Sequence, residues 1–171
     1  LTGINLGTGR TATAIAAGIF HTCAILDNGS VKCWGLNGNG RLGIDNTTTM
    51  GDDAGEMALL PVVNLGTGRT ATAITTGYGY YSCALLDNAS VKCWGLNGAG
   101  QLGIDTSTQM GASTGSMAQL TGINLGTGRT ATAISAGESH TCALLDNASV
   151  KCWGKNNSGH LGIDNITQMG D

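Results

Sequence analysis

HTCAILDNGSVKCWG, at residues 21–35, is the stretch that decides the fold of this 171-residue chain. Two short runs of residues that favour β-strands flank an Asp-Asn-Gly turn, and each run carries one cysteine. The stretch returns as YSCALLDNASVKCWG at residues 81–95 and as HTCALLDNASVKCWG at residues 140–154. The sequence therefore predicts the same hairpin three times.

Each hairpin belongs to a longer repeat. The segment NLGTGRTATAI begins at Asn5, Asn64 and Asn124, so the periods are 59 and 60 residues. Alternation in TATAI, the runs TCAIL and SVKCWG, and a plausible fourth run in GRLGI predict about four short antiparallel strands per unit. This size and strand number are typical of a β-propeller blade, so we expect an all-β fold. The expected units are residues 1–59, 60–119 and 120–171, with the last loop truncated.

The composition supports a compact β fold and excludes several function classes. Only 11% of the residues are charged, 29 are glycine and one is proline, which disfavours both long helices and disorder. A net charge of −3 argues against a general nucleic-acid surface. No apolar run approaches the roughly 18 residues that a membrane helix needs. We therefore expect neither nucleic-acid partners nor membrane insertion.

The hairpin register brings the two cysteines of each copy together. A turn at residues 27–29 places Cys23 opposite Cys33, and opposed strand residues lie within the Cα separation that a disulfide accepts. The same register pairs Cys83 with Cys93 and Cys142 with Cys152. Three local pairs with no cysteine left over indicate an oxidising compartment. We therefore expect an extracellular, cell-surface or periplasmic location.

Two other uses of the cysteines remain open at this stage. A zinc site could combine His21, Cys23 and Cys33, but the second unit has Tyr81 in place of the histidine and a fourth ligand is lacking. Buried free thiols in a cytosolic protein are the second alternative, because cysteine is readily buried. The disulfide interpretation is favoured over both.

The repeated stretches also resemble a known family. HTCAILDNGSVKCWGLNGNGRLG, YSCALLDNASVKCWGLNGAGQLG and HTCALLDNASVKCWGKNNSGHLG are similar to the repeat of the regulator of chromosome condensation, here in a disulfide-containing, extracellular variety. The resemblance implies β-propeller blades, usually in rings of about seven. The nucleotide-exchange activity of that family depends on loops that do not match this chain residue by residue. It is therefore not carried over.

Few side chains suggest a chemical site. The first loop gathers a weak calcium candidate, Asp45, Asp52, Asp53 and Glu56, but the second unit has Ala112, Ser113 and Ser116 at three of these positions. No Ser-His-Asp or paired-carboxylate arrangement persists through the units, so we expect no enzyme and no cofactor. Possible N-glycosylation sequons lie at Asn28, Asn46, Asn88, Asn147, Asn156 and Asn165.

Recurring arginines and tryptophans have simple structural interpretations. Rings of Arg10, Arg69 and Arg129 could meet an acidic partner, although solvated edge charges explain them better. Trp34, Trp94 and Trp153 could stack on a sugar or a base, yet packing in the blade core explains their recurrence more simply.

These observations predict a structural scaffold built from propeller blades. Leu1 aligns with Leu60 and Asp171 with Asp52, so the segment leaves two blade faces open. We expect these faces to meet further copies of the same repeat, in a longer array or fibre. A protein- or glycan-binding module that uses the long GID…M loops is the alternative, and an exchange-factor-like regulator of a small GTPase is the second alternative.

Overall fold

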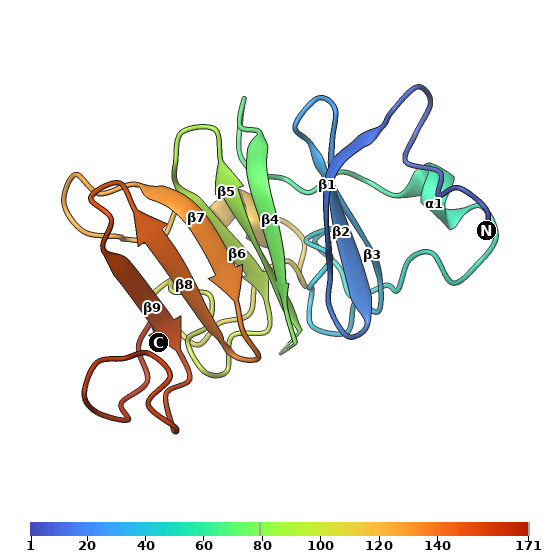
Figure 1. Ribbon diagram of the computed structural model, residues 1–171. Coiled ribbons are helices and arrows are strands. Elements are labelled where there is room, and N and C mark those ends of the chain that lie inside the picture. Colours follow the sequence, from blue (N-terminus) through green and yellow to red (C-terminus); the bar gives the residue numbers. More distant parts are fainter. Residues whose placement is uncertain (79, 171) are drawn as a thin grey trace.

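The computed structural model describes residues 1–78 and 80–170 as three antiparallel sheets that stand side by side (Figure 1). Each sheet has three strands in sequence order, and the first sheet lies to the right and the third to the left of the view. The all-β prediction is confirmed. The strands are β1 (Ala12–Ala17), β2 (His21–Leu26), β3 (Val31–Gly35), β4 (Ala71–Gly77), β5 (Tyr81–Leu86), β6 (Val91–Gly95), β7 (Ala131–Ala136), β8 (His140–Leu145) and β9 (Val150–Gly154).

The predicted hairpin register is confirmed. Cys23 pairs with Cys33 and Ile25 with Val31 across β2 and β3, and the other two hairpins repeat this pairing. The third turn residue is left-handed in each copy. It is Gly29 in the first hairpin (φ 75°), whereas Ala89 (φ 61°) and Ala148 (φ 64°) adopt the same conformation with a side chain present. The turn type therefore overrides the residue preference of alanine.

The fourth strand expected at GRLGI (residues 40–44) does not form. The N–H of Gly40 donates to the carbonyl of Asn37, and the N–H of Gly43 donates to that of Gly40, so the chain makes two successive turns. Both glycines have positive φ, at 72° and 67°. The sheet gains only one further bridge, between Gly35 and Met50. Each blade therefore has three strands and a single outer bridge.

Neighbouring blades pack through the inner strand of one blade and the hairpin of the blade before it. Strand β4 contacts β1 and β2, and β7 contacts β4 and β5. At the first contact, the N–H of Val63 donates to the carbonyl of Val31 and the N–H of Ala71 to that of Gly29, each at 2.8 Å. The second contact repeats both bonds, from Ile123 to Val91 and from Ala131 to Ala89.

Polar side chains also join the blades in a repeated way. The indole N–H of Trp94 and the hydroxyl of Ser82 both donate to the carbonyl of Arg41 in the blade before, each at 3.0 Å. Trp153 and Thr141 make the same two bonds to the carbonyl of Gln101. Trp94 and Trp153 are thus buried between blades, whereas Trp34 is only partly buried.

Two one-turn helices precede the second and third blades, α1 (Glu56–Leu59) and α2 (Ser116–Gln119). The carboxylate of Asp45 accepts bonds from the N–H groups of Gly115 and Met117 and from the hydroxyl of Ser116, which ties α2 to the first blade. Within residues 1–78 and 80–170, no helix is long and apolar enough to cross a membrane.

Candidate functional site

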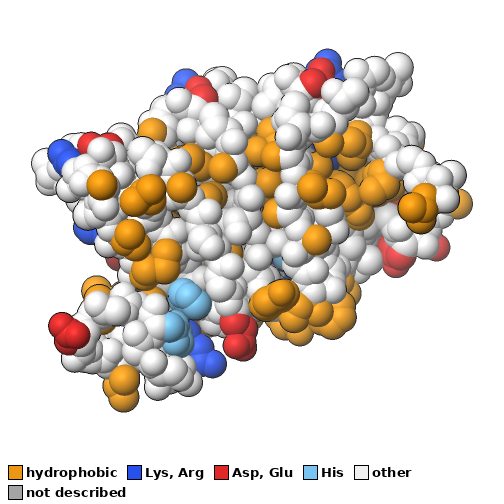
Figure 2. All heavy atoms as spheres, in the orientation of Figure 1, with side chains coloured by type: hydrophobic (Ala, Val, Ile, Leu, Met, Phe, Trp, Pro, Cys, Tyr) orange, Lys and Arg blue, Asp and Glu red, His pale blue; other side chains and the backbone are white. Residues whose placement is uncertain are grey.

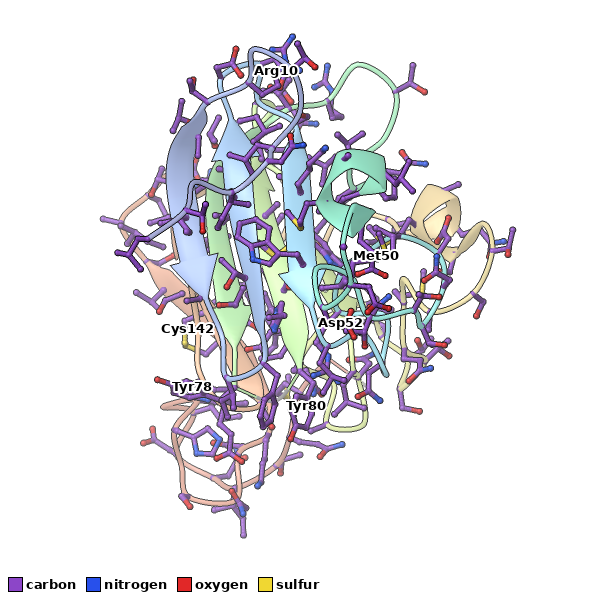
Figure 3. All side chains as sticks on the ribbon, turned by 90° about the vertical axis from the view of Figure 1, so that its right-hand side faces the viewer. Arg10, Met50, Asp52, Tyr78, Tyr80 and Cys142 are labelled. Atoms are coloured by element: carbon purple, nitrogen blue, oxygen red, sulfur yellow. A yellow bond between two sulfur atoms is a disulfide. The ribbon has the colours of Figure 1, made fainter. Side chains whose placement is uncertain are left out.

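The most prominent surface feature is a cluster of apolar side chains at the turns between β1 and β2 and between β4 and β5. We call it the aromatic patch and define it as Ile19, Phe20, Tyr78 and Tyr80. Ile19, Phe20 and Tyr78 are exposed, at 52%, 51% and 61%, and the rings of Phe20 and Tyr80 stack with centroids 5.9 Å apart. Hydrophobic side chains gather at the lower edge of Figure 2. Figure 3 shows Tyr78 and Tyr80 together at one end of the sheets.

A buried cation lies beneath the aromatic patch. The guanidinium carbon of Arg41 lies 4.3 Å from the centre of the Tyr80 ring, and the side chain is only 2% exposed. One terminal nitrogen donates to Asn39, whereas Nε and Nη1 have no hydrogen-bond partner among the described residues. Burial lowers the pKa of Arg41, and Tyr80 raises it in part. Contact between the cation and the ring therefore compensates the buried charge and holds Tyr80 in place.

The surface at this end of the sheets becomes polar toward the third blade. A shallow depression runs from Tyr78 and Tyr80 to Glu138 and Ser139. Beyond it, the rings of His140 and His160 lie 4.6 Å apart in a second depression that Lys155 also lines. Burial and His160 both lower the pKa of His140. This end of the sheets is therefore apolar over two blades and polar over the third.

Buried hydrogen bonds support the aromatic patch from below. His21 bonds the hydroxyl of Ser82 through Nε2 at 2.9 Å. Burial, and secondarily the charge of Arg41, lower the pKa of His21 to about 4, so its ring is neutral at pH 7. In the next blade the Tyr81 hydroxyl donates to the carbonyl of His140, and burial raises the pKa of Tyr81. These groups join the blades and present no exposed nucleophile or base.

The opposite end of the sheets is charged and internally paired. Arg10, which Figure 3 labels at the end away from the tyrosines, donates to the carboxylate of Asp27 at 3.0 Å. The equivalent pairs are Arg69 with Asp87 and Arg129 with Asp146. Such exposed pairs contribute little to stability. Each of these arginines therefore has an acidic partner within its own blade, which fits its interpretation as a solvated edge charge.

The calcium candidates do not converge in the structure. The carboxylate of Asp45 is engaged by α2, as described above. Glu56 instead accepts bonds from the N–H groups of Gly51 and Asp53, which lower its pKa. Over the described part of the chain, no three His, Cys, Asp or Glu residues are placed to hold a metal ion.

All six cysteines are paired within their hairpins. The structure joins Cys23 to Cys33, Cys83 to Cys93 and Cys142 to Cys152, with Cα atoms 4.0, 4.0 and 4.1 Å apart. No cysteine among the described residues is free. With its sulfurs bonded and His21 turned to Ser82, the first hairpin offers no ligand set for zinc.

The sequons differ in accessibility. Asn156 is buried, and its amide donates to the carbonyls of Asn165 and Thr167. A glycan on Asn156 is therefore incompatible with the folded chain, which corrects that candidate. The other five asparagines are exposed, and their glycosylation stays a prediction; they are Asn28, Asn46, Asn88, Asn147 and Asn165.

Sequence reasoning missed the aromatic patch, although a signal for it was present. The three units are nearly identical through their hairpins, but the turn before each hairpin reads GIFH in the first unit, GYGYY in the second and GESH in the third. Variation in a turn next to a nearly invariant hairpin is typical of a surface that is not used for blade packing. Comparing the repeats position by position would have found it.

Comparison with known proteins gives the chain a family. The regulator of chromosome condensation (RCC1) repeat matches residues 12–41, 71–101 and 131–159. The mitochondrial RCC1 domain-containing protein RUG3 of Arabidopsis thaliana is 30% identical over 156 residues, 91% of this chain and 32% of the relative. Protein pim1 of Schizosaccharomyces pombe is 29% identical over 153 residues, 87% of this chain and 26% of the relative.

The fold has a solved counterpart. Prp20p of Saccharomyces cerevisiae superposes with a TM-score of 0.69 at 19% sequence identity, over 92% of this chain and 36% of Prp20p. The chain thus spans about a third of the length of the relatives that it matches, or less.

The comparison overturns the expected extracellular, cell-surface or periplasmic location. RUG3, which matches nine tenths of the chain, is a mitochondrial protein. The expectation rested on the six paired cysteines alone. Their pairing follows from opposed positions in a short hairpin, and this geometry by itself does not report the compartment.

The three matched segments contain every strand of the three sheets and together cover over half of the sequence. This chain therefore belongs to the RCC1 repeat family of β-propellers.

Proposed function

We propose that this chain is a protein-binding segment of an RCC1 propeller, and that the aromatic patch is the surface that contacts the partner. The observation that carries the proposal is the exposure of Ile19, Phe20 and Tyr78 together at one end of the sheets. Aromatic side chains are enriched at the centres of protein interfaces, where they bury a large area at a small cost in conformational entropy.

The aromatic patch is also held in position before any partner binds. Tyr80 is stacked on Phe20 and lies over Arg41. Its backbone is left-handed, at φ 67°, and its carbonyl accepts a bond from the N–H of Leu96 at 3.0 Å. A bulky residue rarely adopts this conformation unless its surroundings impose it. Such preorganisation reduces the entropy that binding must overcome.

The long loops after GID are less suited to hold a ligand, because they use their polar groups internally. Asn37 donates to the carbonyl of Asn46 and accepts from the N–H of Leu42, and all its amide bonds stay within its own loop. Asn97 and Asn156 repeat this arrangement. We therefore favour the aromatic patch over the loops as the binding surface.

Relatives support a protein as the partner. A crystallographic study of Prp20p describes its binding to Gsp1p and histones, and another structure shows Kap60 bound to this protein. A dog relative, 26% identical over 159 residues, is named X-linked retinitis pigmentosa GTPase regulator. Regulation of a small GTPase is accordingly the second candidate function.

The test is direct binding of the 171-residue chain to purified Gsp1p and to core histones, measured by surface plasmon resonance. Replacing Phe20 or Tyr78 by serine should weaken binding at least about tenfold, as loss of an interface anchor does. Ile166→Ser is the matched control, because Ile166 is exposed on a loop outside the aromatic patch. Binding to neither protein, or equal binding by all variants, would refute the proposal.

A second measurement separates the two candidates. If the chain regulates a GTPase, it should change the rate at which Gsp1p releases a fluorescent guanine nucleotide, and Tyr78→Ser should reduce that change. Binding without any effect on nucleotide release would leave the protein-binding function and exclude the regulatory one for this probe.

A further inference from the structure

The shallow depression beside the aromatic patch lies on the second blade and on the turns of its two neighbours. Its wall residues come from all three units; they are Ile19, Tyr78, Tyr80, Leu96, Glu138 and Ser139. The volume is about 530 Å³, which is enough for a long side chain of a partner. We call this depression the patch groove.

Glu138 is the one charged wall residue of the patch groove within the part of the chain that the structure describes. It stands at the place that Ile19 occupies in the first unit, since GESH follows the equivalent strand to GIFH. Glu138 is exposed, and the ion pairs among the described residues all join an arginine to an aspartate at the opposite end of the sheets. The patch groove therefore combines an apolar wall with a carboxylate that has no cationic partner.

The groups on the far side of Glu138 do not neutralise its charge. Glu138 also borders the second depression, which holds the two histidines and Lys155. Figure 2 shows an acidic side chain between the histidines and the hydrophobic side chains at the lower edge. Burial and the neighbouring His160 lower the pKa of His140, so this ring is neutral at pH 7. No ion pair joins Lys155 to Glu138.

Tyr78 provides the open aromatic face of the patch groove. The Tyr80 ring already contacts Phe20 and the guanidinium of Arg41. By contrast, no ring or cation of the described residues contacts the exposed Tyr78 ring. Arg41 is buried and is not a wall residue, so it places no positive charge in the groove. An open tyrosine face attracts a cation, because the quadrupole of the ring is negative at its face.

We propose that the patch groove takes an arginine side chain of the partner protein, with its guanidinium stacked on Tyr78 and paired with Glu138. The inference rests on the proposed function, because it names the side chain that the partner places beside the aromatic patch. A guanidinium is planar, so it can lie on a ring and donate two hydrogen bonds to one carboxylate. Its apolar stem would pack against Ile19 and Leu96.

The charge of Glu138 decides against other occupants of the patch groove. An acidic side chain would be repelled by the carboxylate. An apolar side chain would cover the carboxylate without pairing it, which costs free energy. Lysine would be attracted, but its compact ammonium lacks the planar fork that can stack and form two parallel bonds, so it should bind more weakly than arginine.

The experiment is an NMR titration of the isotope-labelled 171-residue chain with the peptide acetyl-Ala-Leu-Arg-Leu-Ala-amide. Three further peptides carry lysine, norleucine or glutamate in place of the arginine, so differences in affinity report the central side chain. The reporters are the backbone amide signals of Leu96 and Ser139, which are wall residues. The arginine peptide should bind at least about threefold more tightly than the norleucine peptide, with lysine between them and glutamate weakest, as expected for an exposed charge pair with stacking.

Two positions test the assigned contacts. Glu138→Gln removes the charge and keeps the shape, so it should abolish the preference for arginine over norleucine and leave the affinity for the norleucine peptide unchanged. Tyr78→Leu should weaken the arginine peptide about threefold, whereas Tyr78→Phe keeps the ring and should retain its affinity. Asp53→Asn is the control for loss of a carboxylate, because Asp53 is exposed on the first loop and is not a wall residue.

The outcomes separate this inference from the proposed function. Equal binding of the four peptides, tightest binding of the glutamate peptide, or an arginine preference that survives Glu138→Gln would overturn the inference. Each of these results is compatible with a protein partner that loses affinity on Phe20→Ser. Conversely, unchanged binding of Gsp1p and histones by Phe20→Ser would refute the proposed function, whatever the peptides show.

Discussion

The three hairpins allow one substitution to be tested in two environments that differ only in their neighbour. Val91 and Val150 occupy the same place in identical stretches of sequence, but Val91 is fully buried under the third blade and Val150 is largely exposed. We predict that Val91→Ala destabilises the chain much more than Val150→Ala does.

The difference follows from burial. Val→Ala removes two carbons, and at about 0.8 kcal/mol for each buried methylene, with a cavity added, Val91→Ala should cost about 2 to 3 kcal/mol. Val150→Ala should cost about 0.5 kcal/mol or less, as surface substitutions do. The lost β-propensity of valine is common to both variants and cancels in the comparison.

The measurement is urea unfolding of both variants and the wild type, followed by circular dichroism at a protein concentration low enough to exclude self-association. The slope of the free energy of unfolding against urea should stay unchanged. Costs that agree to within about 0.5 kcal/mol would refute the packing of the third blade on the second hairpin.

Three further predictions concern the cysteines, His21 and the acidic loop. Removing one disulfide by Cys83→Ser with Cys93→Ser should cost about 3 kcal/mol of stability, and non-reducing peptide mapping of the wild type should find links only within hairpins; free thiols or links between units would contradict this. Burial lowers the pKa of His21 to about 4 from 6.5, so the unfolded chain binds a proton at a higher pH than the folded chain does. The free energy of unfolding should therefore be at its full value above pH 6.5 and fall by about 3 kcal/mol as the pH drops to 4. His21→Tyr, which introduces the residue of the second unit, should remove that part of the pH dependence, and an unchanged slope would count against it. Millimolar calcium should leave the melting temperature unchanged, because Asp45 and Glu56 bond different backbone groups; a rise of several degrees would reinstate the site.

The features that could be predicted from sequence are local ones. The hairpin register, and with it the pairing of Cys23 with Cys33, depends on a three-residue turn and on strand alternation within a few residues on either side. The repeat period made the all-β propeller architecture predictable in the same way. The fourth strand failed because GRLGI has the composition of a strand, while its glycines and the buried Asn37 side chain favour two turns.

The aromatic patch could not be predicted as a site from propensity or motif. Its residues come from two units, and Arg41 joins them from a loop 21 residues after Phe20. Their meeting depends on how the first two blades pack, and each turn read alone resembles an ordinary polar or aromatic connection.

The sequence by itself determined that this chain contains three hairpin units, each closed by its own disulfide, because turn chemistry, strand alternation and cysteine register act over about ten residues. Tertiary structure alone decided which of those units are covered. Val91 and Val150 have the same local sequence, and so do Ile123 and Ile4, yet one of each pair is packed and the other is exposed. Burial is a property of the neighbouring surface rather than of the segment, so identical sequences acquire different roles according to their place in the row of blades.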